Sequence, residues 1–347
     1  MGEPASTCPP LSRPASGRRT KCKRCANRVE VNLRQHNAGF CRDCFVFYFR
    51  RQVERSIERE RMLDTQEPVL VAVSGGKDSL ALWDVLVELG YRTTGLHLAL
   101  GIGEYSRRST EITRAFAEAR GLSLIVVPLE DQGLAVPAVA QATRRPACSA
   151  CGTMKRHFFD KAAIDGGFPV VATGHNLDDE AARLLGNVLH WKIDHLQRQS
   201  PVLAPRHDVF VRKVKPLFRC SEYESAVYAF FRRIDYVVDE CPNSLGATQL
   251  VYKDALNRIE ATSPGSKLQF VQEFLRKAQA AFAAVDDIPP ERCVSCGMPA
   301  YGRTCSFCRL VAEVEQRREQ GAGSTKHHIV PVGEAAQEDR APSAPAS

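Results

Sequence analysis

The sequence lacks any long apolar run. No segment approaches the ~18 consecutive apolar residues of a membrane-spanning helix, and the first twenty residues contain no apolar stretch that would act as a secretory signal. We therefore expect a cytoplasmic protein that has no membrane partner.

Two common phosphate-loop spacings, Gly-x-x-x-x-Gly-Lys-[Ser/Thr] and Gly-x-Gly-x-x-Gly, are also missing. In their place, the buried-strand pattern Val69–Val73 runs into Ser74-Gly75-Gly76-Lys77-Asp78-Ser79 and then a helical pattern. The glycines let the backbone approach an anion, and the helix N-terminus adds partial positive charge. This stretch predicts a strand, a pyrophosphate-binding loop and a helix.

The length and composition allow one central domain with accessory modules. The chain has 347 residues, of which 44% are hydrophobic and 25% charged, so it can bury a full-sized core. A net charge of +7 permits a nucleic-acid partner without requiring one.

Cysteine is plentiful: ten of the 13 cysteines fall in five Cys-x-x-Cys pairs. In a chain without an export signal, such spacing favours metal sites over disulfides. Four pairs form two sets typical of closed four-thiolate zinc sites, namely Cys22, Cys25, Cys41 and Cys44, and Cys293, Cys296, Cys305 and Cys308.

The central region reads as alternating strands and helices, which predicts a parallel α/β sheet. The expected strands are 69–73, 93–98, 123–127 and 169–173. Ligands bind such sheets at the carboxyl ends of the strands, so the loop at Ser74, the strand end at His97–Leu100 and the segment Gly174–Glu180 should share one crevice. Asp178 and Asp179 offer carboxylates for Mg²⁺; the alternative is an N-capping cluster for the next helix.

The fifth pair, Cys148 and Cys151, has no second pair nearby. A third thiol must come from elsewhere, with Cys241 as the natural candidate and Cys220 in reserve. Three thiolates on an iron–sulfur cube leave one iron free to bind a substrate atom. The competing interpretation is a redox pair that relays persulfide sulfur.

Taken together, these motifs resemble the tRNA 2-thiolation family, specifically the 2-thiouridine synthetases of the TtuA type and their wobble-uridine relatives. The family arranges a zinc knuckle, a Ser-Gly-Gly-x-Asp-Ser loop, a Cys-x-x-Cys-Gly segment, Gly-His-Asn-x-Asp-Asp, a lone cysteine and a zinc ribbon in this order. The resemblance implies an α/β PP-loop fold of the adenine nucleotide alpha hydrolase type, a parallel sheet flanked by helices, with a zinc module at each end.

The resemblance also implies residue roles. ATP would be bound by the loop, by strand-end backbone and by one lysine: Ala72, Val73, Ser74, Gly75, Gly76, Lys77, Asp78, Ser79, Leu98, Lys155 and Gly174. Cys148, Cys151 and Cys241 would hold a 4Fe-4S cluster. Lys155 would face both ATP and the substrate uridine, and Asp179 would be a catalytic or Mg²⁺-orienting carboxylate. Cys148 and Cys151 count among the catalytic residues.

The implied reaction adenylates the 2-oxygen of a tRNA uridine and then transfers sulfur. The implied cofactors are ATP, Mg²⁺, the cluster and two structural Zn²⁺. The partners would be tRNA and a sulfur donor, such as a ubiquitin-like thiocarboxylated carrier protein, and the enzyme would be a homodimer. Two alternatives remain: 2-thiocytidine synthesis, and a zinc-ribbon RNA-binding protein whose nucleotide site is inactive.

The same patterns divide the chain into six parts. We expect a disordered leader (1–20), a zinc knuckle with a basic helix (21–63), the catalytic domain (64–247), a helical extension (248–288), a zinc ribbon (289–320) and a disordered tail (321–347).

Overall fold

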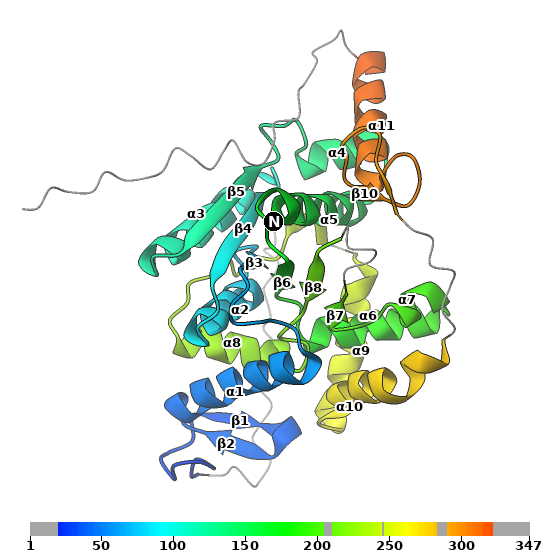
Figure 1. Ribbon diagram of the computed structural model, residues 1–347. Coiled ribbons are helices and arrows are strands. Elements are labelled where there is room, and N and C mark those ends of the chain that lie inside the picture. The colour runs from blue at the N-terminus through cyan, green and yellow to red at the C-terminus, as the bar shows by residue number, and fades with distance from the viewer. Residues whose placement is uncertain (1–19, 205–209, 245, 283–289, 322–347) are drawn as a thin grey trace, which may run out of the picture.

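A six-stranded sheet forms the centre of the protein (Figure 1). The computed structural model describes residues 20–204, 210–244, 246–282 and 290–321. The expected disorder of the leader and the tail falls on residues 1–19 and 322–347, which lie outside these ranges. None of the described helices is long and apolar enough to cross a membrane.

The strand order is β5-β4-β3-β6-β8-β7. The four predicted strands are present within one residue at each end, as the parallel strands β3 (Val69–Ala72), β4 (Thr93–Ala99), β5 (Ser123–Pro128) and β6 (Val170–Thr173). The prediction missed β8 (Arg212–Val214), parallel to β6, and the antiparallel β7 (Val202–Leu203), because both are short and β8 carries two cations. The order reverses between β3 and β6, which is where such sheets bind ligands.

Helices cover both faces of the sheet. Alternate residues of β3 point to opposite sides: Val69 and Val71 join one core, and Leu70 and Ala72 join the other. The first core includes α1 (Arg42–Glu60), α2 (Lys77–Glu88) and α8 (Glu222–Phe231). The second includes α4 (Val136–Thr143), α5 (Ala147–Asp165) and α11 (Ser306–Gly321). Beside the sheet, a third core joins α6 (Leu177–Leu189) to α7 (Ile193–Gln197), α9 (Thr248–Thr262) and α10 (Ser266–Glu273).

The two four-cysteine modules share one plan, a short hairpin followed by a helix. The first pairs β1 (Val31–Leu33) with β2 (Ala38–Phe40), and the second pairs β9 (Glu291–Arg292) with β10 (Pro299–Ala300). In each module, the second cysteine pair lies at the start of the helix. For this reason α1 begins at Arg42, directly after Cys41.

The helical extension differs in detail from its prediction. The first helix of the expected extension over 248–288 is α9, but the remainder is not one continuous helix. After α10 the chain forms a π-helical turn at Phe274–Ala278 and a 3₁₀ turn at Gln279–Ala281. Residues 283–285 lie outside the described ranges.

A buried carboxylate fastens three helices of one face, which yields a test of the fold. Asp84 on α2 is 2% exposed and accepts hydrogen bonds from Tyr228 Oη (2.8 Å) and Arg232 Nε (2.8 Å) near α8, and from Arg120 Nε (3.0 Å) after α3 (Gly103–Ala119). We expect Asp84→Ala to lower the free energy of unfolding by about 3 kcal/mol, because it leaves these three donors without an acceptor. Urea denaturation measures this, with Asp84→Asn as the milder control; an unchanged midpoint would contradict the interpretation.

Candidate active site

The loop after β3 meets the turn after β6 at the point where the strand order reverses. Gly75 has φ +80°, and a Cβ there would lie 2.8 Å from the backbone oxygen of Ser109. A Cβ on Gly174 would lie 2.9 Å from the backbone of Ser79. Gly76 is different, because its Cβ would meet only Ser74 Oγ at 3.5 Å. Backbone contacts therefore require glycine at positions 75 and 174, whereas Gly76 leaves open space in front of the loop.

Helix α3 and the strand β4 hold the loop backbone from the side. Ser109 Oγ donates to Ser74 O at 2.7 Å. His97, which is 1% exposed, lies between Val73 O and Thr110 Oγ1, each 2.9 Å from a ring nitrogen. Burial lowers the pKa of His97 to about 4, so the ring is neutral, and its Nδ1 donates to Val73 O. Sequence reasoning placed the strand end at His97 in the crevice but missed its contact with Thr110, because Thr110 lies on another element, 13 positions along the chain.

The side chains at the start of α2 form ionic contacts. Lys77 Nζ lies 3.1 Å from Asp78 and 2.7 Å from Glu222. Burial would lower the pKa of Lys77, but these two carboxylates raise it above its usual value. Asn176 Nδ2 donates to Asp78 Oδ1 at 3.0 Å, which ties the β6 turn to the loop. Burial raises the pKa of Asp78, and this effect outweighs the opposing influence of Lys77 and Asn176.

The acidic segment at the start of α6 performs the capping role that the sequence offered as an alternative. Asn176 and Asp179 form a reciprocal capping box with two 3.1 Å hydrogen bonds. Asp179 also pairs with Lys253 of α9 at 2.6 Å, and Lys253 reaches Glu222 at 3.2 Å. Burial would raise the pKa of Asp179, but Lys253 lowers it.

Lysines also partner the neighbouring carboxylates: Asp178 pairs with Lys267, and Glu180 pairs with Lys215 at 2.8 Å. A Mg²⁺ ion at Asp179 would therefore have to compete with Lys253. Sequence reasoning missed Glu222 and Lys253, because each lies far along the chain from its partners and follows no motif.

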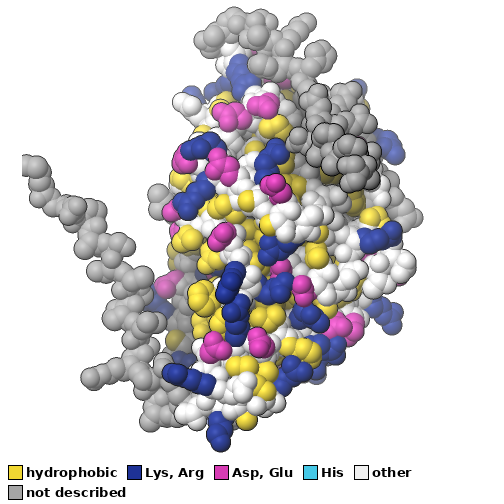
Figure 2. All heavy atoms as spheres, turned by 90° about the vertical axis from the view of Figure 1, so that its left-hand side faces the viewer, with side chains coloured by type: hydrophobic (Ala, Val, Ile, Leu, Met, Phe, Trp, Pro, Cys, Tyr) yellow, Lys and Arg dark blue, Asp and Glu magenta, His cyan; other side chains and the backbone are white. Residues whose placement is uncertain are grey.

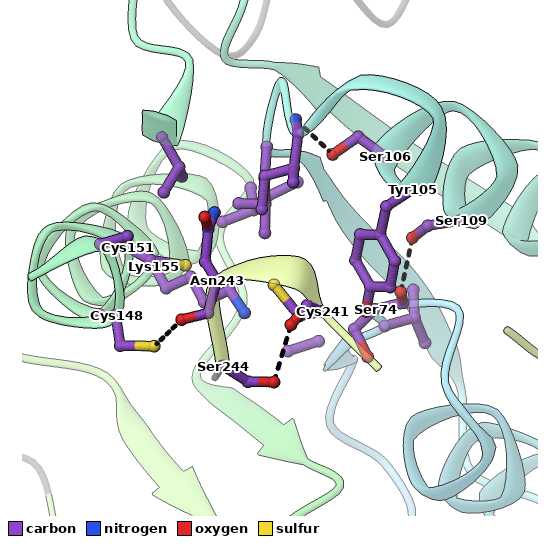
Figure 3. Close-up of a pocket in the computed structure, with 18 of the residues that line it drawn as sticks. Ser74, Tyr105, Ser106, Ser109, Cys148, Cys151, Lys155, Cys241, Asn243 and Ser244 are labelled. Atoms are coloured by element: carbon purple, nitrogen blue, oxygen red, sulfur yellow. Dashed lines mark hydrogen bonds between the residues drawn. The ribbon is translucent and has the colours of Figure 1, made fainter. Parts of the chain in front are cut away.

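A cavity of about 320 Å³ connects the strand ends with three cysteines that lie outside the four-cysteine sets, Cys148, Cys151 and Cys241 (Figure 3). Ala72, Val73, Ser74 and Leu98 line it from the sheet. Its opposite wall carries Cys148, Cys151, Lys155 and Cys241. Lys155 lies one turn after Cys151 on α5, on the same side of the helix. Figure 3 shows Cys241 between the α5 cysteines and Ser74.

A hydrogen bond holds the turn after Cys241 against α5. Cys148 Sγ donates to Asn243 O at 3.2 Å, and Ser244 Oγ donates to Cys241 O at 2.7 Å. Cys220, in contrast, is 1% exposed and belongs to the core on the other face of the sheet. Only Cys241 of these two candidates lines the cavity. Burial raises the pKa of Cys151, and nearby Lys155 opposes this shift.

The two four-cysteine sets are gathered tightly. In each set the four Sγ atoms lie within 4.8 Å of one another, and all eight thiols are free of disulfides. Backbone N–H groups point at the sulfurs, as Cys305 N does toward Cys293 Sγ (3.3 Å). Among the described residues, the Sγ atoms of the three cavity cysteines are not all within 4.8 Å of one another. A four-iron cube places each thiolate on a different iron and holds the sulfurs farther apart than one zinc ion does.

The fold, the loop and the cavity define the class: this is a PP-loop nucleotide-binding protein. A family model described as a PP-loop domain matches residues 48–246, and one described as the N-terminal LIM domain of 2-thiouridine synthetase TtuA matches residues 21–46. The chain belongs to the tRNA 2-thiolation family.

Relatives of known name span almost the same length. The tRNA-5-methyluridine(54) 2-sulfurtransferase of Thermus thermophilus is 48% identical over 86% of this chain and 93% of its own. The cytoplasmic tRNA 2-thiolation protein 1 of Bos taurus is 32% identical over 86% and 89%. Among solved structures, the U34-tRNA thiolase NcsA of Methanococcus maripaludis, which holds a [4Fe-4S] cluster, has a TM-score of 0.70 at 24% identity, covering 84% of this chain and 97% of its own. That match supports the fold.

The glycines predict a separation between folding and binding. We expect Gly174→Ala to lower the free energy of unfolding by about 1–3 kcal/mol, because its Cβ meets the Ser79 backbone. Gly76→Ala should unfold like the wild type and yet bind ATP less tightly, because its Cβ enters ligand space. Thermal denaturation and ATP titration test both; normal ATP affinity of Gly76→Ala would refute the assignment of that space.

The buried histidine predicts a pH dependence. The pKa of His97 is about 4 in the folded protein and about 6.5 when unfolded. Between these values the unfolded state binds the extra proton, so stability falls as pH falls from about 6.5 to 4. His97→Gln should flatten this decline in urea unfolding, although only partly, because burial lowers the pKa of His157 and His175 to about 4 as well. An equally steep decline in the variant would contradict the neutral ring.

Proposed function

We propose that this protein is an ATP-dependent tRNA-uridine 2-sulfurtransferase. One observation carries the proposal: a single cavity joins the carboxyl end of β3 and Ser74, the first residue of its phosphate loop, to Cys148, Cys151, Cys241 and Lys155. Adenylation and sulfur transfer need these two kinds of group within reach of one substrate atom. The names of the relatives support the same reaction.

ATP binds with its phosphates on Ser74–Ser79 and its adenosine beside Leu98 and Gly174. The loop amides and the start of α2 attract the phosphates, and Lys77 supplies a full positive charge. Lys77 pairs with Asp78 and Glu222 at 3.1 and 2.7 Å, so these carboxylates hold it at the loop. Ala72 and Val73 contribute the adjoining backbone.

The 2-oxygen of the uridine attacks the α-phosphorus, and pyrophosphate leaves. Lys77 and the loop amides stabilise the charge that develops on pyrophosphate. Lys155 faces both ATP and the uridine from α5 and stabilises the adenylated oxygen. Sulfur then attacks C2 of the uridine, and AMP leaves with the former 2-oxygen.

Cys148, Cys151 and Cys241 fit a 4Fe-4S cluster. The three thiols line one mostly apolar cavity, and each is free of a disulfide. The cluster, when bound, supplies an iron without a protein ligand, which can hold a sulfide. The chain's own contribution is the turn at 241–244, which places Cys241 in the same cavity as the α5 cysteines. As a cluster ligand Cys148 would be a thiolate, and it would no longer donate to Asn243 O.

Asp179 would be the carboxylate that holds the Mg²⁺ accompanying ATP. Lys253, 2.6 Å from Asp179, would then pair with Glu222 instead, which it already reaches at 3.2 Å.

The remaining partners follow from the same reaction. Each four-cysteine set holds one structural Zn²⁺, because four thiolates leave no open position. The substrate is tRNA in the cytoplasm, and a ubiquitin-like thiocarboxylated carrier delivers the sulfur to a homodimer. The target is uridine 54, since the relatives named for that position are 37–48% identical, above the 26–32% of those named for cytoplasmic 2-thiolation.

A two-part experiment tests this function. Purified protein with ATP and bulk tRNA should release pyrophosphate, whereas protein with ATP alone should release little. Mass spectrometry of tRNA nucleosides from a deletion strain should then show loss of a 2-thiolated uridine, which is 5-methyl-2-thiouridine for the substrate named in the relatives, and digestion should map the loss to position 54. Loss of 2-thiocytidine, or no loss, would refute the proposal.

The metal content gives a second prediction. Anaerobically reconstituted protein should carry about two zinc ions and one 4Fe-4S cluster. Cys241→Ala should lose most of the iron and keep the zinc. Cys220→Ala is the matched control and should keep both, because Cys220 lies in the core of the other face. Full iron in Cys241→Ala would show that Cys241 is not a ligand.

A further inference from the structure

A second cavity, of about 610 Å³, lies between the N-terminal module and the catalytic side chains. Its walls are the end of the β1 strand and its 3₁₀ turn (Asn32–His36), the start of α8, and the turn between α9 and α10. We call it the α8 groove. Its volume suits a nucleotide-sized group.

The α8 groove contains four carboxylates, and each has partners within the protein. Asp178 pairs with Lys267, and Glu222 with Lys77 and Lys253. The two others accept several hydrogen bonds each: Glu224 from Ser221 N (2.7 Å) and Tyr48 Oη (3.0 Å), with His36 at 3.5 Å; Glu260 from Gly265 N (2.6 Å) and Lys267 N (2.9 Å). Lysines thus neutralise Asp178 and Glu222, and the oxygens of Glu224 and Glu260 are occupied by hydrogen bonds within the protein.

Two arginines in the α8 groove have no such carboxylate partner. Arg34 is exposed, and no side-chain hydrogen bond or ion pair of Arg34 is found within the described residues. Arg219 is half-buried, and its guanidinium lies beside the side-chain amide of Gln272, whose oxygen accepts from both terminal nitrogens at 2.8 and 2.9 Å once the amide is turned toward them. Burial and nearby Arg59 lower the pKa of Arg219, whereas Glu60 opposes this shift. Neither guanidinium forms an ion pair with a carboxylate among the described residues, so both can contact an anionic ligand.

An aromatic ring completes the α8 groove. Tyr223 is 55% exposed and stacks on no other ring among the described residues. Exposed aromatic rings next to arginines are the usual platform for unstacked bases of RNA. Glu222 and Asp178 line the same groove. Lys77 of the phosphate loop donates to Glu222, and the backbone N–H of Glu222 donates to Asp178 at the start of α6, so the groove extends to the phosphate loop.

We propose that the α8 groove binds a single-stranded segment of the tRNA substrate next to the uridine that reacts. Arg34 and Arg219 contact its phosphates, and Tyr223 stacks on one base. The proposal rests on the proposed function, because it takes RNA as the substrate.

The first test removes one charge. Arg34→Ala should weaken tRNA binding about fivefold to tenfold at ~0.1 M salt and reduce the slope of log affinity against log salt by about one. ATP binding and zinc content should not change. The matched control is Arg114→Ala: Arg114 is an exposed α3 arginine for which the described residues provide no ion pair. On the α3 side of the molecule, basic and acidic side chains alternate (Figure 2), and this control should bind tRNA normally.

The second test removes the ring. Tyr223→Ala should weaken tRNA binding about tenfold without changing the salt slope, and Tyr223→Phe should keep wild-type affinity, because stacking needs the ring and not the hydroxyl. Ultraviolet cross-linking of tRNA should label the Tyr223 peptide in the full-length protein.

The outcomes separate the two claims. If wild-type protein binds no tRNA, the proposed function fails. If wild-type protein binds tRNA but Arg34→Ala and Tyr223→Ala bind it equally well, only the groove assignment is overturned. Wild-type tRNA affinity combined with lost sulfur transfer would assign the groove to a protein partner and likewise overturn it. Equal loss in Arg114→Ala would show a general charge effect and also refute it.

Discussion

The close approach of two backbones, at Gly174 and Ser79, sets the geometry of the whole site. Because β3 and β6 are neighbours in register, the loop after one and the turn after the other must pass each other, and only a residue without Cβ fits there. The contact brings Asn176 to Asp78, and the same asparagine caps α6. The phosphate loop, the start of α6 and, through Lys253, helix α9 are thereby fixed as one unit.

Features encoded within a few tens of residues could be predicted from the sequence. The four strands and the two four-cysteine sets follow from apolar runs and pair spacing, and the described elements agree with them closely. The ionic contacts of the site could not be predicted. Lys77 and Glu222 lie 145 positions apart, and a glutamate or lysine on a helix has no local pattern that names its partner. The same holds for His97, whose role depends on Thr110 of another element.

The third cysteine shows why a choice between two candidates needs tertiary structure. Cys220 and Cys241 are both lone cysteines, so spacing cannot separate them. The backbone N–H of Cys220 donates to Leu217 O, and the Cys220 side chain packs in the core that includes α8. None of the three cavity cysteines belongs to that core. Cys241 precedes a 3₁₀ turn, Pro242–Ser244, that lies against α5. Pro-Asn-Ser after a cysteine indicates a turn, but only the fold places that turn beside Cys148.

The N-terminal module is physically continuous with the catalytic helices. Leu33 and Phe40 of its hairpin share a core with Phe49 of α1, and Phe49 stacks on Tyr228 of α8 with ring centroids 4.4 Å apart. A structural metal at Cys22–Cys44 would fix the hairpin, since so few apolar residues cannot. The hairpin carries Arg34, and α8 begins at Glu222, which contacts Lys77. A closed metal site that performs no chemistry can therefore set both walls of the α8 groove and one carboxylate of the active site.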